Sequence, residues 1–140
     1  MGFLTVISET GMFHSACLLE IGSGGRKEWR GFHPKAHRTP VGRGALDHSD
    51  RTPYVNHYVR FAVSDQLLNS ALTTIDGGWS GAMYGLGMQD CVSMSADLCR
   101  VCQLSVPAVN FTPYGLIQAL RMWNDVVAYD VRPFPWSIGR

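Results

Sequence analysis

The hydrophobic period of the chain changes at Ser64 from that of a strand to that of a helix. From Tyr54 to Val63 apolar residues alternate with polar or amphipathic ones, which predicts a half-buried strand. Ser64 is a favoured helix N-cap, and the apolar residues after it recur at helical spacing as far as Gly77-Gly78. We therefore expect a helix that ends at these glycines. The chain thus contains both kinds of element, and their order along it decides the fold class.

The remaining elements are predicted from period, caps and breakers. We expect a short strand at 3–7, a hairpin of strands 12–21 and 26–33, helices from about 91 to 103 and from Thr112-Pro113 onward, and one strand in the tail after 126. Residues 34–53 hold three prolines and two glycines, so we expect a long loop there. Strands come first and helices later, which favours an α+β fold: a small antiparallel sheet packed against helices.

The length and composition of the chain indicate one compact domain. With 140 residues, of which 46% are hydrophobic and 16% charged, the chain has the size and balance of a single globular unit. The net charge of +1 offers no global field for nucleic acid. Residues 26–43, however, hold six basic residues and one acidic residue. This basic segment is either a solvated hairpin and loop or a patch that meets an acidic partner.

No apolar stretch approaches the ~18 residues that a membrane span requires. Residues 1–9 lack a basic start and a small-residue cleavage site, so we expect no cleavable secretory signal. The chain is therefore expected to be made in the cytosol, and either kept there or exported by a machine that needs no such signal.

Four cysteines raise the questions of redox and metal chemistry. Cys99 and Cys102 lie on the buried stripe of a predicted helix, where small reduced thiols commonly fill the core. A zinc site with His33 and His37 is disfavoured, because these histidines straddle Pro34 while the two cysteines face the core. We expect no metal and no cofactor.

Cys91 and His14 are the residues best placed for chemistry. Asp90 is a good N-cap, so Cys91 lies in the first turn of a helix, where unpaired N–H groups tend to acidify a thiol. His14 lies just inside a predicted strand, which would hold it as a base. The alternatives are a buried structural cysteine and a core histidine.

Several local patterns resemble one family. They are Phe13-His14-Ser15-Ala16, Gly31-Phe32-His33-Pro34, Tyr84-Gly-Leu before Asp90-Cys91-Val92, and Leu104-Ser-Val-Pro107 before Thr112-Pro113. Together they resemble the circularly permuted papain-like superfamily, of which the NlpC-type peptidoglycan peptidases are members and the lecithin:retinol acyltransferases relatives. The resemblance covers roughly residues 12–122 of a single domain 1–140, with 123–140 as a tail. It implies a permuted papain-like fold with the nucleophile at a helix N-terminus.

The resemblance implies roles for three residues. Cys91 would be the nucleophile, His14 the general base and His33 the third group, which orients the imidazole. A hairpin that turns between Gly22 and Gly25 places His33 opposite His14, and Glu28 and His57 are the weaker alternatives. Relatives commonly have Asn where this chain has Asp90, and a carboxylate there disfavours a thiolate by like charge.

The implied activity is cleavage of a peptide bond in bacterial peptidoglycan. The resemblance extends to antibacterial amidase effectors that a type VI secretion system delivers to the periplasm of a target cell. It therefore implies a monomeric hydrolase whose partners are the peptidoglycan peptide and an immunity protein, without nucleic acid and without membrane insertion. Two other functions remain open: the same Cys-His site acting as an acyltransferase, thioesterase or protein deamidase, and a catalytically silent binding module.

Overall fold

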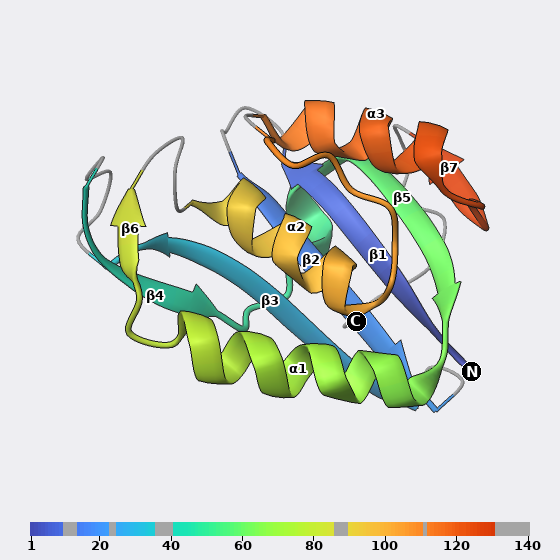
Figure 1. Ribbon diagram of the computed structural model, residues 1–140, viewed down its shortest axis with the longest axis horizontal. Helices are drawn as coiled ribbons and strands as arrows, with labels where there is room; N and C mark the ends of the chain where they lie inside the picture. The colour runs from blue at the N-terminus through green and yellow to red at the C-terminus, as the bar shows by residue number, and fades with distance from the viewer. Residues whose placement is uncertain (10–13, 23–24, 36–40, 86–89, 111, 131–140) are drawn as a thin grey trace.

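The computed structural model describes residues 1–9, 14–22, 25–35, 41–85, 90–110 and 112–130. These residues form an antiparallel sheet of seven strands and three α-helices (Figure 1). The strands are β1 (Gly2–Glu9), β2 (Ser15–Ile21), β3 (Arg26–Pro34), β4 (Val41–Asp47), β5 (Val55–Val63), β6 (Met83–Gly85) and β7 (Ala128–Asp130). The helices are α1 (Asp65–Trp79), α2 (Cys91–Val101) and α3 (Pro113–Trp123), and a 3-10 turn, η1, spans Thr52–Tyr54. The predicted α+β class is confirmed.

The sheet has the order β6-β4-β3-β2-β1-β5-β7, and the three helices cover one of its faces (Figure 1). The main core lies between this helix side of the sheet and the helices, and includes Leu4, Val6, Leu68, Met94 and Leu116. The opposite face, which we call the outer face, carries a smaller buried cluster. Its members are Ile7, Ala16, Leu18, Trp29, Val55 and Tyr58.

All three helices begin where their caps predict. The side chains of Ser64, Asp90 and Thr112 accept hydrogen bonds from backbone N–H groups in the first turns of α1, α2 and α3, which satisfies donors that the helices leave unpaired. The hairpin of β2 and β3 also has the predicted register, because Ala16 pairs with Gly31 and Ile21 with Arg26. Local signals therefore predict these elements well.

The long loop predicted at 34–53 is wrong in part, because it contains strand β4. Gly44 is a breaker in sequence terms, yet here it lets β4 pass directly beneath the ring of Phe32. A Cβ at Gly44 would overlap that ring and would lie 2.8 Å from the carbonyl oxygen of Ala82. Close approach of this kind is a common reason for glycine within a strand. Residues 36–40 of the predicted loop lie outside the described residues.

One further boundary differs from the prediction. Helix α1 continues through Gly77-Gly78 to Trp79, whose ring packs edge-on against Phe32 with centroids 4.9 Å apart. This aromatic contact offsets the propensity cost of the two glycines. The strand expected in the tail after 126 is confirmed as β7, which pairs with β5 at the edge of the sheet.

The basic segment 26–43 is not a uniformly solvated surface. Arg30 is buried, and its guanidinium forms a two-pronged hydrogen bond with Asp76 of α1 at 2.7 and 3.0 Å. Arg26 binds Glu28 at 3.0 Å. Part of the positive charge thus joins β3 to the first helix.

Among the described residues, no helix is long and apolar enough to span a membrane.

Candidate functional site

The site lies at the end of β2, where the ladder between β2 and β3 stops. Its last pair is Ala16 with Gly31, and beyond this point β3 continues alone with β4. The carbonyl of His14 accepts a hydrogen bond from Glu9 N–H of β1 at 3.1 Å. The N–H of Ser15, which belongs to the same peptide unit, therefore points away from β1, toward the gap that opens between β2 and β3.

The thiol of Cys91 fills this gap. Ser15 N–H donates to Cys91 Sγ at 3.4 Å, so sulfur replaces the backbone acceptor that a longer β2–β3 ladder would supply. The neighbouring contact is also between β2 and α2, because the hydroxyls of Ser15 and Ser95 lie 3.0 Å apart. Helix α2 lies on the face of the sheet over β2 (Figure 1), with its first turn at the end of the β2–β3 ladder.

The first turn of α2 holds Cys91 rigidly. Asp90 Oδ1 accepts hydrogen bonds from the N–H groups of Val92 and Ser93, each at 3.1 Å. Cys91 is only 1% exposed and belongs to the main core. The structure therefore places Cys91 at a helix N-terminus, as predicted, but in a more enclosed setting than the sequence suggests.

The expected acidification of this thiol is not present in the structure. The pKa of Cys91 is raised to about 12, because burial and the Asp90 carboxylate raise it by more than the Ser15 N–H lowers it. Loss of hydration for a thiolate thus outweighs the favourable field of the helix N-terminus. Near neutral pH, Cys91 is a thiol.

The imidazole of His14 lies on the outer face. Its Nε2 is 3.4 Å from Oε2 of Glu9 and 3.3 Å from the position that a Cβ on Gly31 would take. Gly31 pairs with Ala16, a member of the outer-face cluster. Burial lowers the pKa of His14, and the Glu9 carboxylate partly opposes this. The ring is therefore neutral near pH 7, as a general base must be.

His14 and Cys91 approach the gap from its two sides. The thiol enters from the helix side and contacts Ser15, while the imidazole lies on the outer face and contacts Glu9. Neither contact is with the other member of the pair. The structure thus brings the two residues to the same end of β2, through the peptide bond between His14 and Ser15. It does not bring sulfur and imidazole into a hydrogen bond.

The candidates for the third group occupy three different places. The β2–β3 register, extended by one pair, sets His33 opposite His14 on the outer face, and the charge of His33 helps to lower the pKa of His14. Nδ1 of His33 lies 2.9 Å from the carbonyl oxygen of Pro34. Glu28 pairs with Leu19 toward the far end of the hairpin, and His57 lies on the helix side, against Ser8 and Tyr114.

Sequence reasoning missed two residues that adjoin the site, Glu9 and Arg51, and gave no role to a third, Tyr84. The side chain of Glu9 is fully buried beside His14, and Arg51 binds its carboxylate at 2.7 and 2.8 Å. Burial raises the pKa of Tyr84 to about 12, with contributions from nearby Cys91 and Asp90. The Tyr84-Gly-Leu pattern pointed toward this tyrosine. Glu9 and Arg51 meet only through tertiary structure.

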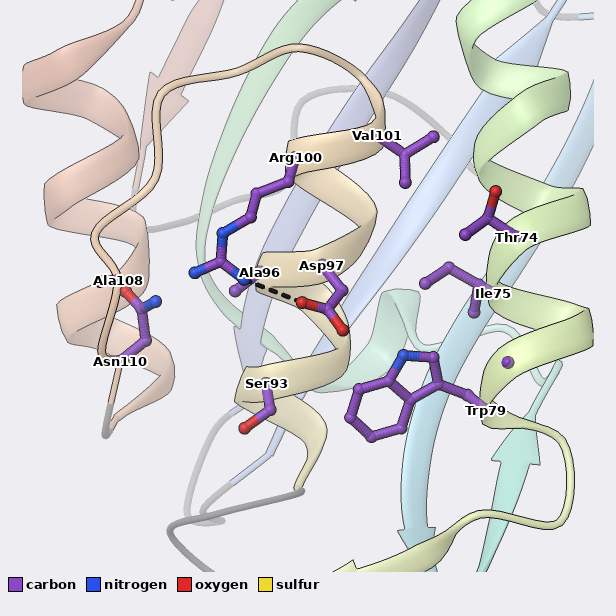
Figure 2. A pocket seen from close by; sticks show the side chains of 11 residues that line it. Thr74, Ile75, Trp79, Ser93, Ala96, Asp97, Arg100, Val101, Ala108 and Asn110 are labelled. Atoms are coloured by element: carbon purple, nitrogen blue, oxygen red, sulfur yellow. Dashed lines mark hydrogen bonds and ion pairs between the residues drawn. The ribbon is translucent and has the colours of Figure 1, made fainter.

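A hollow of about 740 Å³ lies between α1, α2 and the segment around Asn110. Figure 2 shows the indole of Trp79 and the Asp97–Arg100 ion pair along its walls. Arg100 also donates to the carbonyl oxygen of Pro107 at 2.7 Å. The hollow reaches α2 at Ser93, two residues from Cys91.

The other three thiols are structural. Cys17, Cys99 and Cys102 are buried and form no disulfide, which confirms the prediction for Cys99 and Cys102. Within the described part of the chain, no group of three or more His, Cys, Asp or Glu side chains is arranged to hold a metal ion.

Comparisons of the chain with protein-family models, with curated proteins and with solved structures find no match.

Proposed function

We propose that this protein is a cysteine hydrolase with a permuted papain-like arrangement, which cleaves a peptide bond in bacterial peptidoglycan. The observation that carries the proposal is the Cys91 thiol at the start of α2, in contact with the backbone of Ser15 and thus one residue from His14. The peptidoglycan substrate rests on the resemblance of the sequence motifs. So does delivery by a type VI system into a periplasm where an immunity protein is the natural counterpart.

The proposed reaction has two halves. In the first, the imidazole of His14 takes the thiol proton, sulfur attacks the substrate carbonyl carbon, and the C–N bond breaks as the imidazolium protonates the leaving amine. In the second, His14 takes a proton from water, hydroxide attacks the thioester carbon, and the C–S bond breaks as the imidazolium returns its proton to sulfur. The N–H of Cys91 is the expected oxyanion donor.

Two features of the resting site must change for this reaction. The thiol must lose a proton that burial and Asp90 retain, and the imidazole must come within hydrogen-bond distance of sulfur. Catalytic contacts are often long in a free enzyme and tighten when substrate binds. Because His14 immediately precedes β2 and the gap begins at Ser15, the required movement is confined to one end of a strand.

The same two features favour a second candidate, a catalytically silent binding module. A thiol with its pKa raised to about 12 is a poor nucleophile near neutral pH. An imidazole on the outer face can equally serve as a buried partner of Glu9. Under this alternative, replacing Cys91 alters no reaction. An acyltransferase, thioesterase or deamidase would use the same residues on another acyl group and would differ in the mass of its product.

The test is digestion of purified peptidoglycan, and of its soluble muropeptides, followed by mass spectrometry. The enzymes compared are wild type, Cys91→Ala and the matched control Cys102→Ala, which removes a buried thiol from the other end of α2. We expect fragments that differ from the substrate by one water, produced by wild type and Cys102→Ala and absent with Cys91→Ala. His14→Ala should retain less than about a hundredth of the wild-type rate.

Other outcomes would redirect or end the proposal. Intact peptidoglycan together with ready alkylation of Cys91 would preserve the enzyme class and exclude this substrate. Intact peptidoglycan together with an inert Cys91 would favour the binding module.

A further inference from the structure

A fully enclosed charge near the site is the carboxylate of Glu9. Its side chain is 0% exposed, and it lies between the guanidinium of Arg51 and the imidazole of His14. Arg51 donates to it through Nε at 2.8 Å and through Nη2 at 2.7 Å. His14 Nε2 lies 3.4 Å from Oε2 and has no hydrogen-bond partner among the described residues. A buried ring nitrogen that lies close to a fixed carboxylate but forms no hydrogen bond with the described residues in the resting structure needs an explanation.

We propose that Glu9, held by Arg51, is the positioning residue of the site. It keeps the proton of the neutral His14 ring on Nε2, and so leaves Nδ1 as the nitrogen that accepts the proton of Cys91. The catalytic consequence rests on the proposed function, whereas the protonated nitrogen and the pKa of His14 do not. This assignment moves the third role from His33, on the strand after His14, to a carboxylate on the strand before it.

The contacts of Glu9 with Arg51 fix the orientation of its carboxylate. A two-pronged arginine contact sets both the position and the plane of a carboxylate. Arg51 is itself restrained, because Asp47 lies 3.7 Å from its Nη1 and the ring of Tyr54 lies beneath its guanidinium at 4.5 Å. Asp47, Arg51, Glu9 and His14 thus form a continuous chain of contacts from β4 to the end of β2. A ring nitrogen that faces a carboxylate carries the proton in the neutral imidazole.

Four charged or titratable groups act on His14, each from a different segment. Glu9 of β1 and Asp47 of β4 raise its pKa, while Arg51, just before η1, and His33 of β3 lower it. Burial is the largest influence and lowers the pKa, and Glu9 is the next largest. Glu9 is therefore the group whose removal changes the His14 pKa most. His33 is less suited to the role because its positive form would repel an imidazolium.

The proposed step moves one proton, from Cys91 to His14. When Cys91 loses its proton, Nδ1 of His14 gains it, the ring becomes positive, and Glu9 stabilises that charge. Glu9 stays ionised throughout and exchanges no proton. Because no other group changes charge, the role requires no cofactor or further reactant.

The test is NMR titration of protein labelled with ¹⁵N in its histidines. Wild type is compared with Glu9→Gln and with the matched control Glu20→Gln. Glu20 is also a buried outer-face carboxylate beside an arginine, Arg60, at 3.1 Å, but it lies at the other end of β2. The His14 signals are assigned by their loss in His14→Gln.

We expect the neutral His14 ring of wild type to carry its proton on Nε2. We also expect its pKa to fall in Glu9→Gln and to remain unchanged in Glu20→Gln. A ring protonated on Nδ1 in wild type would overturn the assignment, and so would the same His14 pKa in wild type and Glu9→Gln. The wild-type measurement decides the question even if Glu9→Gln fails to fold.

The catalytic arm uses the peptidoglycan assay. Glu9→Gln should lower kcat at least about tenfold at neutral pH with little change in KM, and Glu20→Gln should leave both unchanged. A normal kcat in Glu9→Gln would remove Glu9 from the reaction. If wild type itself has no activity, the proposed function fails while the titration still tests the positioning of His14.

Discussion

Cys91 is subject to opposing influences within a few ångströms. The start of α2 and the N–H of Ser15 favour a thiolate, whereas burial and the carboxylate of Asp90 oppose it. Burial is the largest of these effects, so the resting thiol is protonated. Asp90 is the one influence that can be removed without opening the core, because asparagine caps a helix as well as aspartate does.

Asp90→Asn should therefore lower the pKa of Cys91 and accelerate its alkylation. The amide keeps the cap on the N–H groups of Val92 and Ser93 but carries no charge. The measurement is the rate of iodoacetamide labelling at Cys91 between pH 7 and 10, read by peptide mass spectrometry. Asp90→Ala should give the same kinetic effect but lose about 1 kcal/mol of unfolding free energy in urea. A slower or unchanged rate in Asp90→Asn would show that its charge does not act on the thiol.

Among the helices and strands, some are determined by local sequence signals and others by tertiary contacts. The caps at Ser64, Asp90 and Thr112 and the alternating strand β5 could be predicted, because each depends on residues close in sequence. Strand β4 could not, because Gly44 is a strand residue only by virtue of the Phe32 ring above it. In the same way, the hairpin register placed His33 opposite His14, but nothing local joins Glu9 to Arg51, which lies 42 residues away.

Replacing glycine by alanine should have opposite effects on the unfolding free energy in β4 and in α1. At Gly44 a methyl group overlaps the Phe32 ring and the Ala82 carbonyl, so Gly44→Ala should lower the unfolding free energy by about 1–3 kcal/mol. At Gly77 in α1 a Cβ has nothing within 4 Å, so Gly77→Ala should raise it by up to about 1 kcal/mol. Urea unfolding of the two variants and of wild type measures both changes in unfolding free energy. Equal effects would contradict the packing of β4 beneath Phe32.

At the scale of the whole molecule, the four buried cysteines together make the unfolding free energy depend on pH. Burial raises the pKa of Cys17, Cys91 and Cys102 to about 12 and that of Cys99 well above 9.0. In the unfolded chain these thiols ionise near their ordinary value of 9.0. The folded state therefore holds more thiol protons above pH 9, and its stability must fall as the pH rises from there toward 12.

Each buried thiol should contribute about 1.4 kcal/mol per pH unit to this decline. Cys102→Ala removes one thiol at the end of α2, so its unfolding free energy should decline less steeply than that of wild type by this amount. Urea unfolding between pH 7 and 10.5 provides the comparison. Parallel curves for the two proteins would mean that Cys102 ionises equally easily in the folded and unfolded states.

The pairing of the Cys91 thiol with the His14 imidazole is central to the proposed function, and one measurement addresses it without a substrate. It is the alkylation rate of Cys91 at pH 7.5 in wild type, in His14→Gln and in the control His57→Gln, whose ring lies on the helix side against Tyr114. We predict slower labelling of Cys91 in His14→Gln than in the other two proteins, because the proposed pairing requires that the His14 ring also reaches sulfur transiently in the free protein and takes the thiol proton, whereas the His57 ring does not. Equal rates in all three proteins would contradict the pairing and leave Cys91 a structural thiol.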